Sequence, residues 1–204
     1  CEMFRVNLKS MAAAHQLHQG TNLRGHLVWA RMAHFQRLLT IRNVPAPEED
    51  EDILQFFREH HDPTIFMERH AMRRGEFRKL ISPLVRSGHL VQDYRGGFKA
   101  VEPLQGSDLW EVKRDYLRDL VQHYPVITLK QVERLAGSPF SAEEISDVMR
   151  EFEEDGTLIK GFLVDDMHDV CWGRHALLDG ADEISRTRDL VIPPSDPLIH
   201  YFGS

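Results

Sequence analysis

The stretch EISDVMREFEEDGTLIK, Glu144–Lys160, decides the predicted fold, because EFRKLISPLVRSGHLVQ, Glu76–Gln92, has the same pattern 68 positions earlier (76 against 144). In both stretches apolar residues occur at positions i, i+3, i+4 and i+7, and a glycine follows. This spacing predicts an amphipathic helix that ends at the glycine. The matched pairs are Phe77 with Ile145, Leu80 with Val148, Ile81 with Met149, Leu84 with Phe152, Gly88 with Gly156 and Leu90 with Leu158.

A short hairpin is predicted after each glycine. HLVQDY and TLIKGFLV have the composition of strands, turn signals follow them, and FKAV and VCW read as second strands. Two further helices are predicted before each of these helices. In the second copy, Thr128 with Gln131 and Ser141 with Glu144 have the spacing of capping boxes at helix starts.

Three helices followed by a two-stranded wing form the winged-helix type of helix-turn-helix. The predicted fold class is therefore mainly α with short β-hairpins (α+β), as tandem winged-helix domains at 48–103 and 107–173. Pro83 lies inside the first copy's third helix, where a kink or split is expected because proline lacks a backbone N–H.

The two ends of the chain are less regular. Residues 1–47 form a basic N-terminal segment, in which HLVWARMAHFQRLLTI fits either a helix or two strands. Residues 174–204 are expected to form a C-terminal helix and an extended segment that packs back on the domains, because apolar residues are frequent near its end.

Charge is distributed in blocks of opposite sign. The whole chain carries −7, but residues 69–99 carry +6 (eight basic, two acidic) and residues 141–169 carry −8 (two basic, ten acidic). Two cysteines are too few for a disulfide framework, which favours a reducing, cytoplasmic location. No apolar run reaches the roughly 20 residues of a membrane span, so no membrane partner is expected.

The +6 block coincides with the first copy's third helix and wing. In a winged helix the third helix enters the major groove and the wing contacts phosphates, so double-stranded DNA is the expected partner. A solvated basic face with no ligand is the alternative interpretation. The candidate DNA-binding residues are Arg73, Arg74, Arg78, Lys79, Arg86, Arg95 and Lys99.

The third helix of the second copy is acidic and should not enter a groove. It is a candidate docking face for a protein partner, and a protein-interaction scaffold is thus the alternative function. Trp29, flanked by arginines, is a further hypothesis for base stacking.

Motifs for chemistry are missing from the sequence. Neither a Gly-x-Ser-x-Gly elbow nor a phosphate-binding loop occurs, and the twelve histidines show no zinc-ligand spacing. Cys171 is expected to be a packed thiol, and Asp165 with Asp166 a hairpin turn. We expect no catalytic residue, no structural metal and no cofactor in this segment.

The C-terminal stretch LVIPPSDPLIHYF, Leu190–Phe202, follows the tandem pattern and carries Pro194, Asp196, Pro197 and Leu198. It resembles a segment of the winged-helix family that includes the interstrand-crosslink-repair DNA glycosylases and modules of large DNA helicases. The resemblance implies a module accessory to DNA repair, helicase action or transcription, or part of a glycosylase. The glutamine motif of those glycosylases is not matched, since Gln16 and Gln19 have a different spacing.

Overall fold

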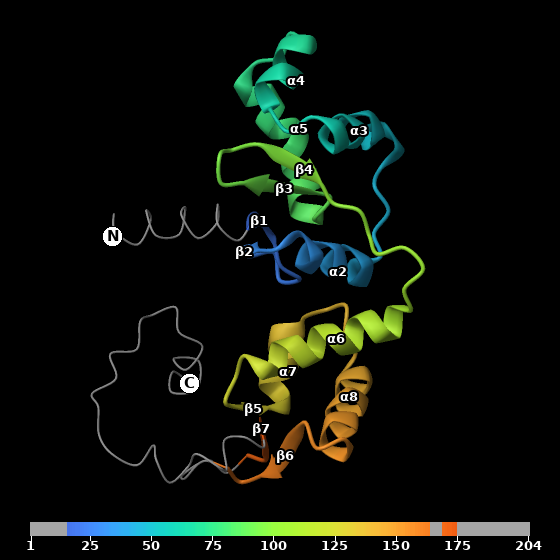
Figure 1. The fold of residues 1–204 in the computed structure, drawn as a ribbon, viewed down its shortest axis with the longest axis vertical. Helices are drawn as coiled ribbons and strands as arrows, with labels where there is room; N and C mark the ends of the chain where they lie inside the picture. The colour runs from blue at the N-terminus through green and yellow to red at the C-terminus, as the bar shows by residue number, and fades with distance from the viewer. Residues whose placement is uncertain (1–15, 164–168, 175–204) are drawn as a thin grey trace, which may run out of the picture. The chain divides into compact units, whose positions relative to one another are not determined.

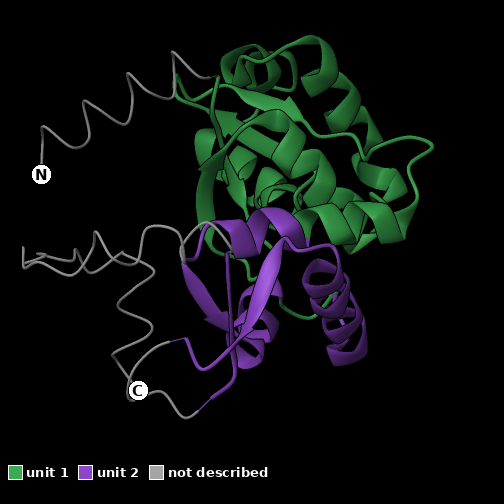
Figure 2. Ribbon diagram, turned by 60° about the horizontal axis from the view of Figure 1, so that its bottom comes forward, with its two compact units in different colours: residues 1–116, 137–139 green, residues 117–136, 140–204 purple. Residues whose placement is uncertain are grey.

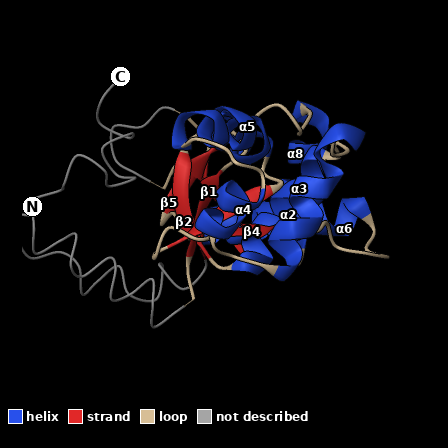
Figure 3. Cartoon of the chain, turned by 90° about the horizontal axis from the view of Figure 1, so that it is seen from above, coloured by secondary structure: helices blue, strands red, loops and turns tan. Residues whose placement is uncertain are grey.

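The computed structural model describes residues 16–163 and 169–174 (Figure 1). The chain divides into two compact units (Figure 2): unit 1 is Cys1–Tyr116 with Gly137–Pro139, and unit 2 is Leu117–Ala136 with Phe140–Ser204. Helices combine with short antiparallel strands (Figure 3), which confirms the expected α+β class.

A four-stranded antiparallel sheet lies in unit 1, in the order β2-β1-β3-β4. His18 of β1 is opposite Asp93 of β3, 75 positions apart (18 against 93), and Gln19 is opposite Gln92. The strands are β1 (His18–Thr21), β2 (Leu27–Ala30), β3 (Leu90–Asp93) and β4 (Phe98–Ala100).

In the described part of segment 1–47, β1 is hydrogen-bonded to β3. The apolar stretch of this segment, which fitted a helix or two strands, forms one strand, β2, followed by α2 (Met32–Arg42). The pairing of β1 with β3, which are 75 positions apart (18 against 93), leaves no local pattern in the sequence. The four-stranded sheet was therefore not predicted.

Helices cover both faces of the sheet. Phe35 of α2 packs on one face, directly over Gly20 of β1. The contact is so close that a Cβ atom added to Gly20 would lie 2.6 Å from the Phe35 ring and 2.8 Å from the Val91 side chain. Phe98 points to the other face, because successive residues of a strand alternate. On that side lie α3 (Glu51–Glu59, after a 3-10 turn at Glu48–Asp50), α4 (Pro63–Arg69) and α5 (Arg74–Ser87).

Aromatic rings fill the core between these helices and the sheet. The Phe57 ring is fully buried and lies 5.1 Å from Phe56, 5.6 Å from Phe66, 6.3 Å from Phe77 and 5.8 Å from Phe98, measured between ring centroids. One side chain thus connects α3, α4, α5 and β4.

The helix α5 runs without a break across Pro83, so the expected split does not occur. Proline removes the N–H that would bond the carbonyl of Lys79. Both Lys79 and Pro83 are exposed, so water can hydrate that carbonyl.

Unit 2 contains a three-stranded antiparallel sheet in the order β5-β7-β6. Its first helix, α6 (Leu109–Gln122), has its residues from Leu117 onward in this unit. The remaining elements are β5 (Val126–Thr128), α7 (Leu129–Ala136), α8 (Ala142–Glu154), β6 (Leu158–Gly161) and β7 (Cys171–Arg174).

The predicted repeat is confirmed in its helix, glycine and first strand. Both α5 and β3 begin 68 positions before α8 and β6 (74 against 142, 90 against 158). The N–H of Arg73 donates to Glu76 Oε2 at 2.8 Å, and the N–H of Ser141 donates to Glu144 Oε2 at 2.8 Å.

The predicted capping boxes of unit 2 are also present. Glu144 N–H donates back to Ser141 Oγ at 3.0 Å. At the start of α7, Thr128 N–H donates to Gln131 Oε1 at 2.8 Å and Gln131 N–H to Thr128 Oγ1 at 3.3 Å. Local hydrogen-bonding residues thus mark the helix starts that the sequence pattern indicated.

Some expectations concern residues outside the described ranges. These are the turn at Asp165 and Asp166, the C-terminal helix and extended segment from 175 onward, and the residues that carry the family resemblance. Among the described helices, none combines the length and the apolar composition needed to cross a membrane.

Candidate nucleic-acid interface

The outward side of α5 is basic. Its inward side is formed by the buried Phe77, Ile81 and Leu84, and the half-buried Leu80 and Val85 pack against the same core. We call its exposed cations the basic face of α5: Arg73 at the N-cap, then Arg74, Arg78, Lys79 and Arg86.

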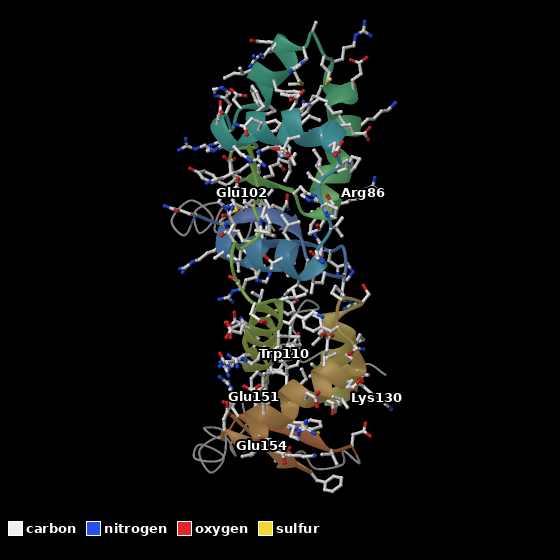
Figure 4. All side chains as sticks on the ribbon, turned by 90° about the vertical axis from the view of Figure 1, so that its right-hand side faces the viewer. Arg86, Glu102, Trp110, Lys130, Glu151 and Glu154 are labelled. Atoms are coloured by element: carbon white, nitrogen blue, oxygen red, sulfur yellow. The ribbon has the colours of Figure 1, made fainter. Side chains whose placement is uncertain are left out.

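Few acidic side chains offset the positive charge of this face. Glu76 is the one acidic residue of α5, and it accepts the N–H of Arg73. Within residues 16–163 and 169–174, no ion pair joins a carboxylate to any cation of the basic face. Arg86 extends into solvent (Figure 4). The surface charge is therefore available to a polyanion.

The candidate Arg95 lies in the tight turn between β3 and β4. The Asp93 carboxylate organises this turn, since Oδ1 accepts the N–H groups of Arg95 and Gly97, each at 2.8 Å. The Arg95 Nε donates to Tyr94 Oη at 2.8 Å, and the guanidinium lies 5.2 Å from the centroid of that ring. Arg95 is exposed, as the wing prediction requires.

Lys99 differs from the other candidates. It is half-buried and lies between Phe98 and Ala100, which face the α3 and α5 side, so Lys99 points to the opposite face. There it lines a pocket of about 270 Å³ with Met32 and Gln36 of α2. The structure therefore does not bring Lys99 together with the basic face of α5.

Two residues that sequence reasoning missed hold the C-terminal end of α5. Thr21 Oγ1 donates to the carbonyl of Val85 at 3.0 Å and approaches that of Arg86 at 3.1 Å. Arg42 Nη1 donates to the carbonyl of Ser87 at 2.7 Å. These bonds supply donors to helix carbonyls that have no partner within the helix.

Arg42 is half-buried, and its main partners are carbonyls. Its Nη2 donates to the carbonyls of Asn22 at 2.6 Å and Thr21 at 3.2 Å. Burial lowers the pKa of this guanidinium, which remains charged at neutral pH. A cation at a helix C-terminus also interacts favourably with the helix dipole. Arg42 thus fastens α2 and β1 to α5.

A buried histidine completes this end of the unit. The Nε2 of His89 bonds the carbonyl of Val44 at 3.1 Å, and Nδ1 bonds Ser87 Oγ at 2.7 Å. Burial is the largest influence on the pKa of His89 and lowers it, and the positive charge of Arg42 lowers it further. The hydrogen bond to Val44 and the negative charge of Asp50 act in the opposite direction.

We expect a pH dependence of stability from His89. An unfolded histidine binds a proton below pH ~6.5, whereas the folded imidazole resists it, so the free energy of unfolding falls as pH decreases through that range. The loss approaches about 1.4 kcal/mol per pH unit for one proton. His18 contributes in the same direction, because burial and Lys99 lower its pKa.

Urea denaturation at pH 5 to 8 tests this expectation. His89→Gln should flatten the dependence, and the same change at the exposed His26 should not. An unchanged slope in His89→Gln would contradict the assignment to His89.

The equivalent surface of unit 2 is not basic. Positions 68 residues after Arg74, Arg78, Lys79 and Arg86 hold Ala142, Ser146, Asp147 and Glu154. Glu151 and Glu154 carry the acidic character along α8 (Figure 4). The one basic residue of α8, Arg150, pairs with Asp147 at 2.6 Å.

The described residues contain neither a metal site nor a reactive thiol. No group of three or more His, Cys, Asp or Glu side chains there is arranged to hold a metal ion. Cys171 is buried, donates its Sγ–H to the carbonyl of Asp169 at 3.2 Å, and has its pKa raised by burial. It is therefore a packed thiol.

Searches against known proteins returned no relative. No family model, no curated protein and no solved structure matches this chain.

Proposed function

We propose that the chain is a tandem winged-helix module that binds duplex DNA through unit 1. The observation that carries this proposal is the basic face of α5, which is exposed and has no acidic ion-pair partner among the described residues. The order of elements supports it: α3, α4, α5 and the β3–β4 hairpin follow one another in unit 1, and α6, which ends in unit 2, is followed there by β5, α7, α8, β6 and β7.

In this mechanism α5 faces the major groove and Arg95 contacts the backbone from the wing. Arg74 and Arg78 are four residues apart, so they lie on one side of the helix. Four to six phosphate contacts give a slope of log Kobs against log salt of about −4 to −5. Raising salt from about 50 to 200 mM then weakens binding by roughly 10² to 10³-fold.

Fluorescence anisotropy with a labelled random duplex tests the proposal. The chain should bind at low salt with that slope, and Arg74→Glu/Arg78→Glu should lose roughly 100-fold or more in affinity, because two contacts become repulsions. The matched control is Lys130→Glu/Arg134→Glu, which reverses two exposed charges four residues apart on α7 of unit 2.

Equal binding at the two salt concentrations would overturn the mechanism, as would equal losses in the two double variants. If the chain does not bind at low salt, the basic face is a solvated surface. The alternative function then takes first place: a scaffold whose partner docks on the acidic α8, where Glu143, Glu153 and Glu154 are exposed.

A further inference from the structure

Two turns of unit 1 have the same construction. The first, Asn22–His26, joins β1 to β2, and the second, Asp93–Gly97, joins β3 to β4. Each has Asn or Asp first, arginine third and glycine fourth. The glycines, Gly25 and Gly96, have φ of 79° and 93°, a region that L-residues rarely adopt.

The first turn is held by the Asn22 side chain. Its Oδ1 accepts the N–H of Arg24 at 3.0 Å and that of His26 at 2.9 Å. Along the backbone, Asn22 N–H donates to the carbonyl of His26 at 2.9 Å, and Gly25 N–H donates to the carbonyl of Asn22 at 2.9 Å.

The second turn has the same four hydrogen bonds at the corresponding atoms. Asp93 Oδ1 accepts from Arg95 and Gly97, each at 2.8 Å. Asp93 N–H donates to the carbonyl of Gly97 at 2.9 Å, and Gly96 N–H to the carbonyl of Asp93 at 3.1 Å. Both turns therefore present an exposed arginine at the third position, Arg24 or Arg95.

The first turn is also fixed to the C-terminal end of α5. Thr21, the residue before the turn, bonds the carbonyls of Val85 and Arg86 near the end of α5. The half-buried Arg42 joins the carbonyl of Asn22 to that of Ser87. Arg24 is thus held at the same end of the unit as Arg86, and little ordering is required when a ligand binds.

We propose that the β1–β2 turn is a second phosphate-binding turn, in which Arg24 contacts the DNA backbone as Arg95 does. This inference rests on the proposed function of α5 and adds a contact that the sequence did not indicate. The ligand group is the phosphodiester, which pairs with a guanidinium through charged hydrogen bonds.

The positions of the β1–β2 and β3–β4 turns bear on whether the substrate is duplex or single-stranded DNA. His18 is level with Asp93, and four residue steps along β1 lead from there to Asn22, about 13 Å. That distance separates the starts of the two turns, which leave the sheet at opposite ends, so Arg24 and Arg95 lie further apart than this. A duplex holds phosphates rigidly at two such separated points, so duplex rather than single-stranded DNA is the expected substrate.

The test compares Arg24→Gln, Arg95→Gln and the double variant by anisotropy, on a duplex and on one of its single strands. Each single change should reduce the magnitude of the duplex salt slope by about 0.9, and the double change by about 1.8. Arg134→Gln in unit 2 removes the same charge and should leave the slope unchanged. Matching circular dichroism melts show that each variant is folded.

The outcomes separate the inference from the function on which it depends. If the duplex slope falls in Arg95→Gln but not in Arg24→Gln, the second turn is not a contact, and binding through α5 stands. Equal effects of Arg24→Gln on duplex and single strand would overturn duplex DNA as the substrate of the β1–β2 turn. Absence of salt-sensitive binding by the unmodified chain would remove the proposed function and the inference together.

Discussion

Phe57→Ala should destabilise unit 1 by about 3 to 5 kcal/mol, the usual cost of removing a buried aromatic side chain. The Phe57 ring has no exposed area and lies among four other phenylalanine rings from α3, α4, α5 and β4. Alanine at this position creates a cavity. The neighbouring rings can fill it only by adopting less favourable side-chain rotamers. A domain with ordinary stability of about 5 to 15 kcal/mol would lose roughly a fifth of it or more.

Hydrogen exchange under native conditions measures this effect for unit 1 alone, since peptides from α3 and α5 report its opening. Ile65→Ala is the control, because Ile65 belongs to α4 but is 49% exposed. It should cost below about 1 kcal/mol. Comparable losses in the two variants would show that Phe57 is not at the centre of the core.

Gly88→Ala should cost about 3 to 5 kcal/mol, more than the conformation of that residue explains. Its φ is 90°, where a side chain costs about 1 to 2 kcal/mol. An added Cβ would lie only 2.2 Å from Arg42 Nη1, so the guanidinium must move. That movement breaks the bond to Ser87, and a hydrogen bond to a charged group contributes about 1.5 to 3 kcal/mol.

The repeat provides the matched control, Gly156→Ala. Gly156 has a φ of 77°, and no atom lies within 4 Å of an added Cβ. This variant should lose only the conformational cost, about 1 to 2 kcal/mol. Urea denaturation of both variants measures the difference. If the two losses are equal, Arg42 does not hold the end of α5 in solution.

Local patterns predicted the repeated half of each unit. An amphipathic helix, its cap and its terminal glycine depend on neighbours within a few residues, so Ser141, Glu144 and Gly156 could be interpreted without a structure. The exposure of Arg74 and Arg78 followed from the same periodicity, because the buried stripe of the helix is formed by Phe77, Ile81 and Leu84 and does not include these positions.

Contacts between distant segments could not be predicted in the same way. The four-residue strand β1 carries no signal of its partner, since pairing depends on backbone groups that every residue has. Arg42 looked like one more cation of a basic segment, and only its surroundings in the fold bury it. Lys99 was grouped with Arg95 by position, although strand alternation places it on the other face.

The two units also differ in the surface charge of their equivalent helices, α5 and α8. Positions that present arginine and lysine on α5 present alanine, serine, aspartate and glutamate on α8, while the buried positions stay apolar in both helices. One folding pattern thus supports two surfaces of opposite charge. We expect a polyanion to bind one of them and to be repelled by the other.

The long separation of β1 from β3 has a consequence for synthesis of the chain. The β1–β2 hairpin leaves the ribosome before the strand that completes its sheet, and that strand follows 75 residues later (18 against 93). At about 5 to 20 residues per second, the hairpin waits roughly 4 to 15 seconds with one edge unpaired. During that interval its short length limits pairing with other nascent chains.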